Sequence, residues 1–237
     1  MMSDDASRRS PAGFLTLAVV SAIFLSSLGV WQLHRLTWKE ALIAERRLAF
    51  SVGSIELTDI TQKPAEWSRV RLTGHFLHGK SLFVGPRSWR GVPHWRLVTG
   101  FELASGGNVL VDRGWSPYSR SKAEIFRPEG VVSIKGIVRY PAPPGPFTPV
   151  APPQGDEWIA IDPLPMVGRL GIPWQQSAPF WINAMPTSGN GRYPAADARL
   201  ILPPNNHLGY AITWFGLAAG VLGVAGAYWR RSRKTTS

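Results

Sequence analysis

The chain has 237 residues, a mean hydropathy of -0.04 and a formal net charge of +11. It contains no cysteine, which excludes disulfides, thiol redox chemistry and thiolate metal sites, and its four methionines are too scattered to predict a soft-metal carrier. The basic residues of the two tails and those just after the first apolar segment are expected to face anionic membrane lipids, and we predict no nucleic-acid partner.

An apolar segment near the N-terminus, Ala12 to Leu33, has 22 residues and no charge. A helix of that length spans ~33 Å, enough for a hydrocarbon core of ~30 Å. A cleaved signal peptide is the alternative, but its apolar region is normally shorter and a small-residue cleavage site follows it. Because this segment continues into WQLHRLTWKE, we predict a tail of residues 1–11 and a retained transmembrane helix at residues 12–33.

The next segment, residues 34–50, combines strong helix formers with charges and has neither glycine nor proline, so the helix should continue to about Phe50. The sequence LGVWQLHRLTWK at its start puts Trp31, Arg35 and Trp38 on one helical face. An aromatic belt with basic anchors would explain that face. Such a belt does not explain Gln32, and an arginine there could equally hold an anionic ligand group.

The middle of the chain, residues 51–204, has short β-branched runs separated by glycine and proline, a texture typical of strands. We predict one small β-rich domain of α+β class, with a hairpin at the turn ASGGN and a short helix near Leu164 to Arg169. The stretch YPAPPGPFTPVAPPQGDE is too rich in proline for a helix or a central strand and should be a loop. The predicted strands are Val70–Thr73, Ser81–Val84, Arg96–Glu102, Asn108–Val111, Val132–Arg139, Trp158–Ile161, Phe180–Asn183 and Leu200–Leu202.

Catalytic motifs are weak in this sequence. An S-x-x-K match at Ser119 to Lys122 lacks its companion motifs. His75 and His78 are three residues apart, which suits a metal site on a helix but not on a strand, where the two side chains would face opposite ways. His94 has no visible partner, so we expect a surface or structural role. We predict that the protein is not an enzyme.

A second uncharged segment runs from Leu208 to Trp229 and leads into the basic sequence RRSRK. It predicts a second transmembrane helix at residues 205–229, followed by a basic tail of residues 230–237. One face of this helix has small residues and should pack on the first span or on a partner membrane protein: Gly216, Gly220 and Gly223. Roughly opposite, an imidazole and two aromatic rings share a face: His207, Tyr210 and Trp214.

His207 would lie in the first turn of this helix. The sequence PPNN precedes it, and Asn205 or Asn206 could cap the free N–H groups. The positive end of the helix dipole favours a neutral imidazole, the form that ligates a metal such as haem iron. Tyr210 and Trp214, deeper in the helix, could line an apolar macrocycle. The alternative is an interfacial histidine that only caps and anchors the helix.

Basic residues near the helix ends predict the orientation. Both tails are expected on the cytoplasmic side because of Arg8, Arg9, Arg230, Arg231, Arg233 and Lys234. Arg35, Lys39, Arg46 and Arg47 favour the opposite orientation, but they lead into a long segment, and long segments translocate largely regardless of charge. The β-rich domain is therefore expected in the periplasm. A short N-terminus with two aspartates is unlike a mitochondrial transit peptide, so we expect a bacterial cytoplasmic membrane.

Two segments at opposite ends of the chain, LGVWQLHRLTWK and NNHLGYAITWFGL, resemble the signature membrane blocks of the Surfeit locus protein 1 family, assembly factors for haem-copper cytochrome oxidase. The family patterns L-G-x-W-Q-x-x-R-x-x-W-K and N-x-H-x-x-Y-x-x-T-W-[FY]-G-L are both met in full. Between them, RVRLTGHF, VLVDRGWSP, IKGIVR and WIAID resemble the family's domain segments in the same order. The chain departs from its relatives in the proline-rich loop, where PVAPPQG replaces an asparagine-containing segment, and at Asn183, where relatives often have aspartate.

The resemblance implies a two-span protein that binds haem a transiently and assists its insertion into cytochrome c oxidase subunit I, with haem a synthase as a further partner. It implies that His207 is associated with haem, as the candidate axial ligand of the iron. Five other positions carry over from the motif: Trp31, Gln32, Arg35, Trp38 and Lys39. Arg35 is a candidate partner for a propionate, and His34 a candidate second ligand. The alternative is a structural scaffold that holds oxidase subunits or haem synthase together without binding haem, and a membrane-bound hydrolase is a third interpretation.

Overall fold

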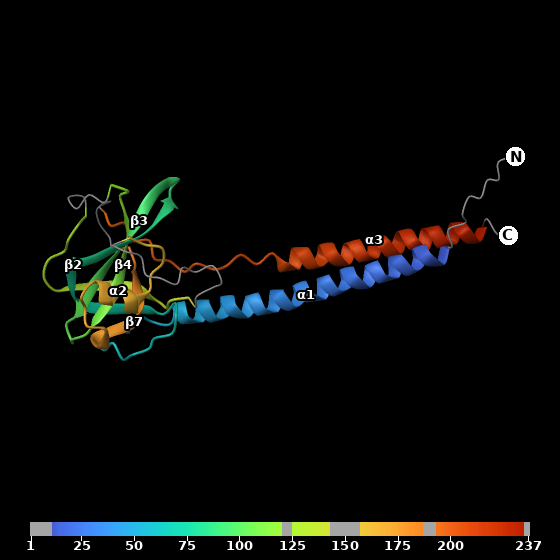
Figure 1. The fold of residues 1–237 in the computed structure, drawn as a ribbon. Helices are drawn as coiled ribbons and strands as arrows, with labels where there is room; N and C mark the ends of the chain where they lie inside the picture. Colours follow the sequence, from blue (N-terminus) through green and yellow to red (C-terminus); the bar gives the residue numbers. More distant parts are fainter. Residues whose placement is uncertain (1–10, 120–124, 143–156, 187–192, 235–237) are drawn as a thin grey trace. The chain divides into compact units, whose positions relative to one another are not determined.

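The computed structural model describes residues 11–119, 125–142, 157–186 and 193–234. The chain divides into two compact units, a helical unit of Met1–Ala44 with Leu202–Ser237 and a β-rich unit of Glu45–Ile201. The predicted α+β class is confirmed (Figure 1). The proline-rich loop and the S-x-x-K match fall largely outside the described residues.

In chain order the elements are α1 (Pro11–Ser51), β1 (Ile55–Glu56), β2 (Arg69–Trp89), β3 (Val92–Leu103), β4 (Asn108–Ser116), β5 (Val132–Arg139), β6 (Glu157–Trp158), α2 (Pro163–Arg169), a short 3-10 helix (Trp174–Gln176), β7 (Ser177–Ala184) and α3 (His207–Lys234).

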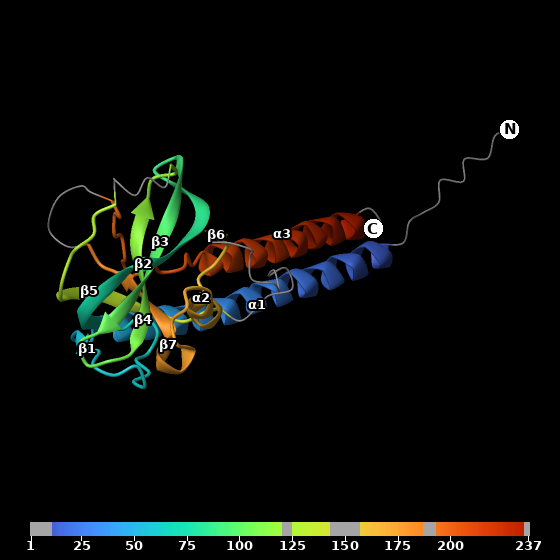
Figure 2. The same cartoon turned by 60° about the vertical axis from the view of Figure 1, so that its left-hand side comes forward.

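The helical unit consists of α3 and most of α1, which lie side by side and run in opposite directions (Figures 1 and 2). Both helices are long and apolar enough to cross a membrane. Most of their large apolar side chains are exposed, as expected for helices that face lipid. Helix α1 continues without a break through Phe50, as its composition predicts.

Small residues form the contact between α1 and α3. The buried alanines recur at intervals that keep one face of each helix toward the other, and include Ala211, Ala218 and Ala225 of α3 with Ala18 and Ala22 of α1. A Cβ added at Gly29 would lie 2.7 Å from the ring of Phe215. The absence of a side chain at Gly29 therefore makes room for the Phe215 ring.

The glycine face of α3 takes no part in this contact. A Cβ added at Gly216, Gly220 or Gly223 would meet nothing within 4 Å. The opposite face of α3, which bears His207, is the one turned toward α1, where His207 meets the buried polar side chain of Gln32. The prediction that the glycines pack on the first span is therefore wrong. The face of α3 that packs on α1 is the one that bears His207, because this packing pairs His207 with Gln32 and keeps both polar groups away from lipid. Their packing on a partner protein stays a prediction.

The strands of the β-rich unit form a closed barrel. β2 pairs with β3, β3 with β4, β4 with β7 and β7 with β5, and β5 pairs back onto β2. The β4–β7 pair is parallel and the other four pairs are antiparallel. Closure satisfies both edges of each of these five strands. The short strands β1 and β6 add to β2 from outside this ring.

Strand β2 is long enough to serve two partners. Residues Arg69–Gly74 pair with β5, and the rest of the strand pairs with β3 across two register shifts. The two predicted strands at 70–73 and 81–84 are therefore parts of one strand. Gly74, in the interval between them, approaches the backbone of Glu102 so closely that no Cβ would fit. This glycine marks a close approach of two strands and not a break in the strand.

Three apolar clusters hold the β-rich unit together. The first includes Val70, Leu72, Phe101, Val109, Val111, Phe180 and Ile182. The second packs α2 on the sheet through Met166 and Val167 against Leu82, Val98 and Leu110. The third joins the last turns of α1 to the barrel, with Ala49 and Phe50 against Trp67 and Ile137.

The remaining predicted elements of the β-rich unit are confirmed in part. The strand at Val132–Arg139, the ASGGN hairpin and the helix near 164–169 are confirmed. The predicted strand at 158–161 has only Trp158 within a strand, and residues 200–202 form no strand at all. Strand β1 is absent from the prediction because two paired residues give no periodic signal.

Candidate functional site

His207 begins helix α3. The carbonyl oxygen of Asn206 accepts a hydrogen bond from the Tyr210 N–H at 3.3 Å, which places Asn206 at the N-cap position. The side-chain oxygen of Asn205 is buried and accepts no hydrogen bond, so the prediction that Asn205 could cap the helix is wrong. The first-turn position predicted for His207 is confirmed, and its imidazole is half-buried.

The two motifs at opposite ends of the chain meet at this imidazole. The Oε1 atom of Gln32 lies 2.7 Å from Nδ1 of His207, a good hydrogen-bond distance. Gln32 is 8% exposed, so α1 and α3 shield this bond from solvent. Sequence reasoning placed both residues in a candidate site, but their 175-residue separation gave no signal that they touch.

The aromatic members of the motifs stand on the same two helices as this pair. Tyr210 is 57% exposed one turn below His207, and Trp214 is half-buried one turn further along α3. Trp31 of α1 is next to Gln32 in sequence and is 53% exposed. Tyr210 and Trp31 thus present apolar surface outward, which is what an apolar ligand beside His207 would need.

The basic residues of the first motif follow toward the β-rich end of α1. The guanidinium of Arg35 lies 4.3 Å from the ring centre of Trp38, and the Lys39 ammonium lies 5.7 Å from the same centre. Both contacts are cation–π interactions on a ring that is 50% exposed. By helical phase, Arg35 and Lys39 lie within about 60° of Gln32. They can therefore offer positive charge to an anionic group near the imidazole.

His34 does not join this constellation. It stands two residues after Gln32, which on an α-helix puts the two side chains about 160° apart. Gln32 faces His207, so His34 faces away from it. The structure therefore does not bring together the two histidines considered as a ligand pair.

The remaining histidines have separate partners in the β-rich unit. Nε2 of His75 lies 3.2 Å from the Glu102 carboxylate, and Nε2 of His78 lies 2.8 Å from the Pro128 carbonyl oxygen. His94 is buried, with Nε2 3.2 Å from the Tyr193 hydroxyl. A structural role for His94 is confirmed, and the alternative surface position is wrong.

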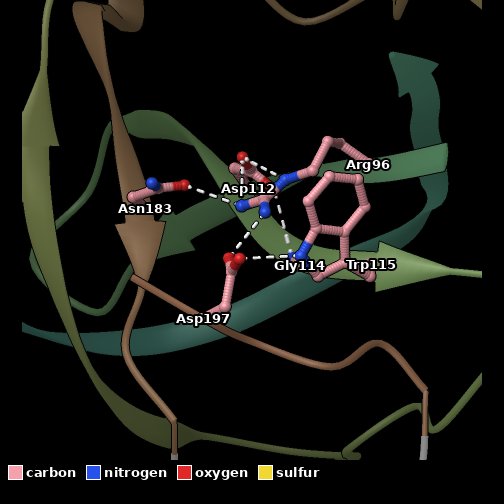
Figure 3. A network of polar contacts seen from close by, with 6 residues as sticks. All are labelled: Arg96, Asp112, Gly114, Trp115, Asn183 and Asp197. Atoms are coloured by element: carbon pink, nitrogen blue, oxygen red, sulfur yellow. Dashed lines mark hydrogen bonds and ion pairs between the residues drawn. The ribbon is translucent and has the colours of Figure 1, made fainter. Parts of the chain in front are cut away.

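Sequence reasoning missed a buried polar network centred on Arg96 of β3 (Figure 3). Its Nε and Nη2 donate to the Asp112 carboxylate on β4, at distances between 2.8 and 3.1 Å. Its Nη1 donates to Asp197 at 2.6 Å, and Nη2 also donates to the Asn183 amide oxygen at 3.1 Å. The Trp115 indole donates to Asp197 at 2.7 Å. The network therefore ties the segment that leads to α3 onto the barrel.

The electrostatics of this network depend on Arg96. Burial raises the pKa of the Asp112 carboxyl, while the Arg96 charge and a hydrogen bond from the Gly114 N–H oppose that rise. Burial lowers the pKa of Arg96, but the charges of Asp112 and Asp197 outweigh this effect and hold it above its ordinary value. The guanidinium thus stays charged. The signal in the sequence was a pair of opposite charges at the ends of two predicted strands, with Arg96 at the start of one and Asp112 directly after the other.

A second buried arginine, Arg113, lies on β4 and has no carboxylate partner among the described residues. Its Nη2 donates to the Phe126 carbonyl oxygen at 2.5 Å, and its guanidinium lies 4.5 Å from the ring centre of Phe76. Burial and the nearby charge of Arg127 lower the pKa of Arg113 to about 10.

Comparison with known proteins covers nearly the whole chain. The model of the SURF1 family matches residues 19–219. A SURF1-like protein of Monosiga brevicollis is 30% identical over 231 residues, covering 90% of this chain and 86% of the relative. Surfeit locus protein 1 of Xenopus tropicalis is 31% identical over 229 residues, covering 87% of this chain and 72% of the relative. A SURF1-like protein of Caenorhabditis briggsae is 31% identical, with 82% and 68% covered. The chain therefore belongs to the SURF1 family.

Proposed function

We propose that this protein is a non-enzymatic assembly factor for haem-copper cytochrome c oxidase, and that it binds haem a transiently through His207. Membership of the SURF1 family supports the assembly role. The observation that carries the haem proposal is the hydrogen bond between Gln32 and His207, because it unites the two membrane motifs around one imidazole.

The side chains around His207 fit a haem. An imidazole nitrogen is a common axial ligand of haem iron, and Nδ1 of His207 is already engaged by Gln32. Exposed aromatic rings at Tyr210 and Trp31 offer apolar surface for the macrocycle. Arg35 offers a guanidinium to a propionate, although it would have to share that charge with the Trp38 ring. When bound, haem a would be the cargo that the oxidase needs, and the protein would keep its apolar face out of water.

The proposed setting is a bacterial cytoplasmic membrane crossed by α1 and α3, with both termini in the cytoplasm and the β-rich unit in the periplasm. The length and apolar composition of the two helices support a membrane location. The proposed partners are cytochrome c oxidase subunit I, which receives the haem, haem a synthase, which makes it, and the anionic lipids around the basic tails.

The visible spectrum of the purified full-length protein, co-expressed with the enzymes of haem a synthesis, tests the proposal. We expect a haem a spectrum in the wild type, lost in His207→Ala and kept in His34→Ala, because His34 faces the other side of α1. A pigment that survives His207→Ala, or no pigment in the wild type, would overturn haem binding by this histidine.

A structural scaffold without haem is the second candidate, and the open glycine face of α3 favours it. Gly216, Gly220 and Gly223 leave room for a partner helix to approach closely. In that case Gly220→Leu should abolish co-purification of oxidase subunit I, and His207→Ala should leave oxidase assembly intact. Loss of assembled oxidase in His207→Ala together with unchanged co-purification in Gly220→Leu would reject the scaffold.

A further inference from the structure

We infer that Gln32 is a positioning residue for His207, holding the imidazole with its proton on Nδ1 and leaving Nε2 free as the ligand nitrogen. The inference rests on the proposed function, since it assigns Gln32 a part in the same site. It also makes a statement about the haem-free protein, which can be measured on its own.

The geometry of the hydrogen bond fixes the proton. The atom of Gln32 that faces His207 is the carbonyl oxygen Oε1, and such an oxygen only accepts hydrogen bonds. Nδ1 of His207, 2.7 Å away, must therefore donate and carry a proton. A neutral imidazole has one N–H, so its Nε2 bears a lone pair. Among the described residues, His207 forms no hydrogen bond through Nε2.

The environment of the bond makes this arrangement lasting. Gln32 is buried against α3, so water cannot readily replace its amide oxygen as the hydrogen-bond acceptor of the imidazole. In an apolar setting an imidazole N–H without an acceptor is costly, so the tautomer that meets Oε1 is favoured over the one that does not. An exposed acceptor would give little preference, because water satisfies either nitrogen equally well.

Metal-binding histidines generally need such a partner. In most known sites the second ring nitrogen donates to a carboxylate, a carbonyl or a water, which fixes the ring and its tautomer, and loss of that partner lowers metal affinity about 10–100-fold. Gln32 supplies the carbonyl here without placing a charge inside the membrane-spanning segment. The role also explains why an amide stands among the aromatic and basic residues of the first motif.

The opposite orientation of the Gln32 amide would give the opposite result. With its NH₂ group toward His207, Nδ1 would accept, the proton would move to Nε2, and that nitrogen could not bind iron. The two orientations thus predict different tautomers of the haem-free protein. The tautomer can be determined directly from the ¹⁵N chemical shifts of the ring.

The first experiment uses the haem-free, full-length protein in lipid nanodiscs, labelled with ¹⁵N-histidine. The His207 signals are assigned by their loss in His207→Ala. We expect the Nδ1–H tautomer in the wild type and in Gln32→Glu, which keeps an acceptor, and a shift toward Nε2–H in Gln32→Leu. An Nε2–H tautomer in the wild type, or the same tautomer in Gln32→Leu as in the wild type, would overturn the inference.

The second experiment titrates haem a into the same three proteins and follows the absorption spectrum. We expect about 10–100-fold weaker binding in Gln32→Leu and recovery in Gln32→Glu. If the wild type binds no haem a, the proposed function fails while the tautomer result still decides the role of Gln32. If wild-type binding depends on His207 and Gln32→Leu binds equally well, only the inference about Gln32 fails.

Discussion

Two arginines on neighbouring strands, Arg96 and Arg113, meet the cost of burial in opposite ways. Arg96 gives all three guanidinium nitrogens to acceptors, two of them carboxylates. The Arg113 guanidinium donates to one carbonyl oxygen and lies over one aromatic ring. Because the pKa of Arg113 is lower in the folded than in the unfolded chain, its protonated form destabilises the folded state at any pH below about 10.

Replacement of each arginine by methionine should therefore have opposite effects. Arg96→Met leaves Asp112 buried without a counter-charge, and we expect it to lose about 3–5 kcal/mol of the free energy of unfolding. Arg113→Met removes a buried charge, and we expect a variant at least as stable as the wild type. Urea unfolding of the full-length protein, followed by tryptophan fluorescence, measures both. Equal losses in the two variants would contradict this account.

The candidate site shows at residue scale what sequence reasoning can and cannot give. Gln32 and His207 were both found from their motifs, because polar residues stand out in apolar segments. Their contact was not found, since it depends on the rotation of two helices about their axes, and the glycines of α3 suggested the wrong rotation. The Arg96 network was missed for a similar reason, because Asp197 lies in an irregular segment that has no periodicity to place it.

At the scale of elements, the contact of α1 with α3 depends on the missing side chain at Gly29. Leucine at this position would need the volume that the Phe215 ring fills. We expect Gly29→Leu to separate the helices at the level of Gln32, one turn away, and Gly220→Leu to leave them in place because its surroundings are open.

Chemical cross-linking can measure this effect, since the chain has no cysteine of its own. Cysteines replacing Gln32 and His207 should be joined by a short bifunctional thiol reagent in an otherwise unchanged protein. The yield should fall strongly when Gly29→Leu is added and stay the same when Gly220→Leu is added. A similar fall in both would mean that the glycine face of α3 also takes part in helix pairing.

Elements with a strong local signal were predicted well, and those defined by partners were not. Helix α1 and strand β5 follow from composition and β-branched runs over many residues. The long strand β2 was divided in the prediction, because Gly74 and Gly79 look like breaks when the neighbouring strands are unknown. Closure of the barrel had no signal in the sequence, since pairing of β5 with β2 joins segments about 60 residues apart.

At the scale of the whole molecule, the proposed orientation can be tested with single cysteines. Lys63→Cys lies in an exposed loop of the β-rich unit, and Thr236→Cys lies in the C-terminal tail of the sequence. A membrane-impermeant maleimide should label Lys63→Cys in spheroplasts and Thr236→Cys only after lysis. The reverse pattern would place the β-rich unit in the cytoplasm and contradict the proposed topology.

The order of strands in the barrel has a consequence for the synthesis of the protein. β7 lies between β4 and β5, so these two earlier strands have no common border until Ser177–Ala184 has been made. The nascent chain must therefore carry two open strand edges while about 40 further residues are added after β5, and unpaired edges invite pairing with other chains. A chain that ends before β7 should aggregate even though four of the five barrel strands are present, whereas one that ends after Ala184 can close its barrel before α3 is translated.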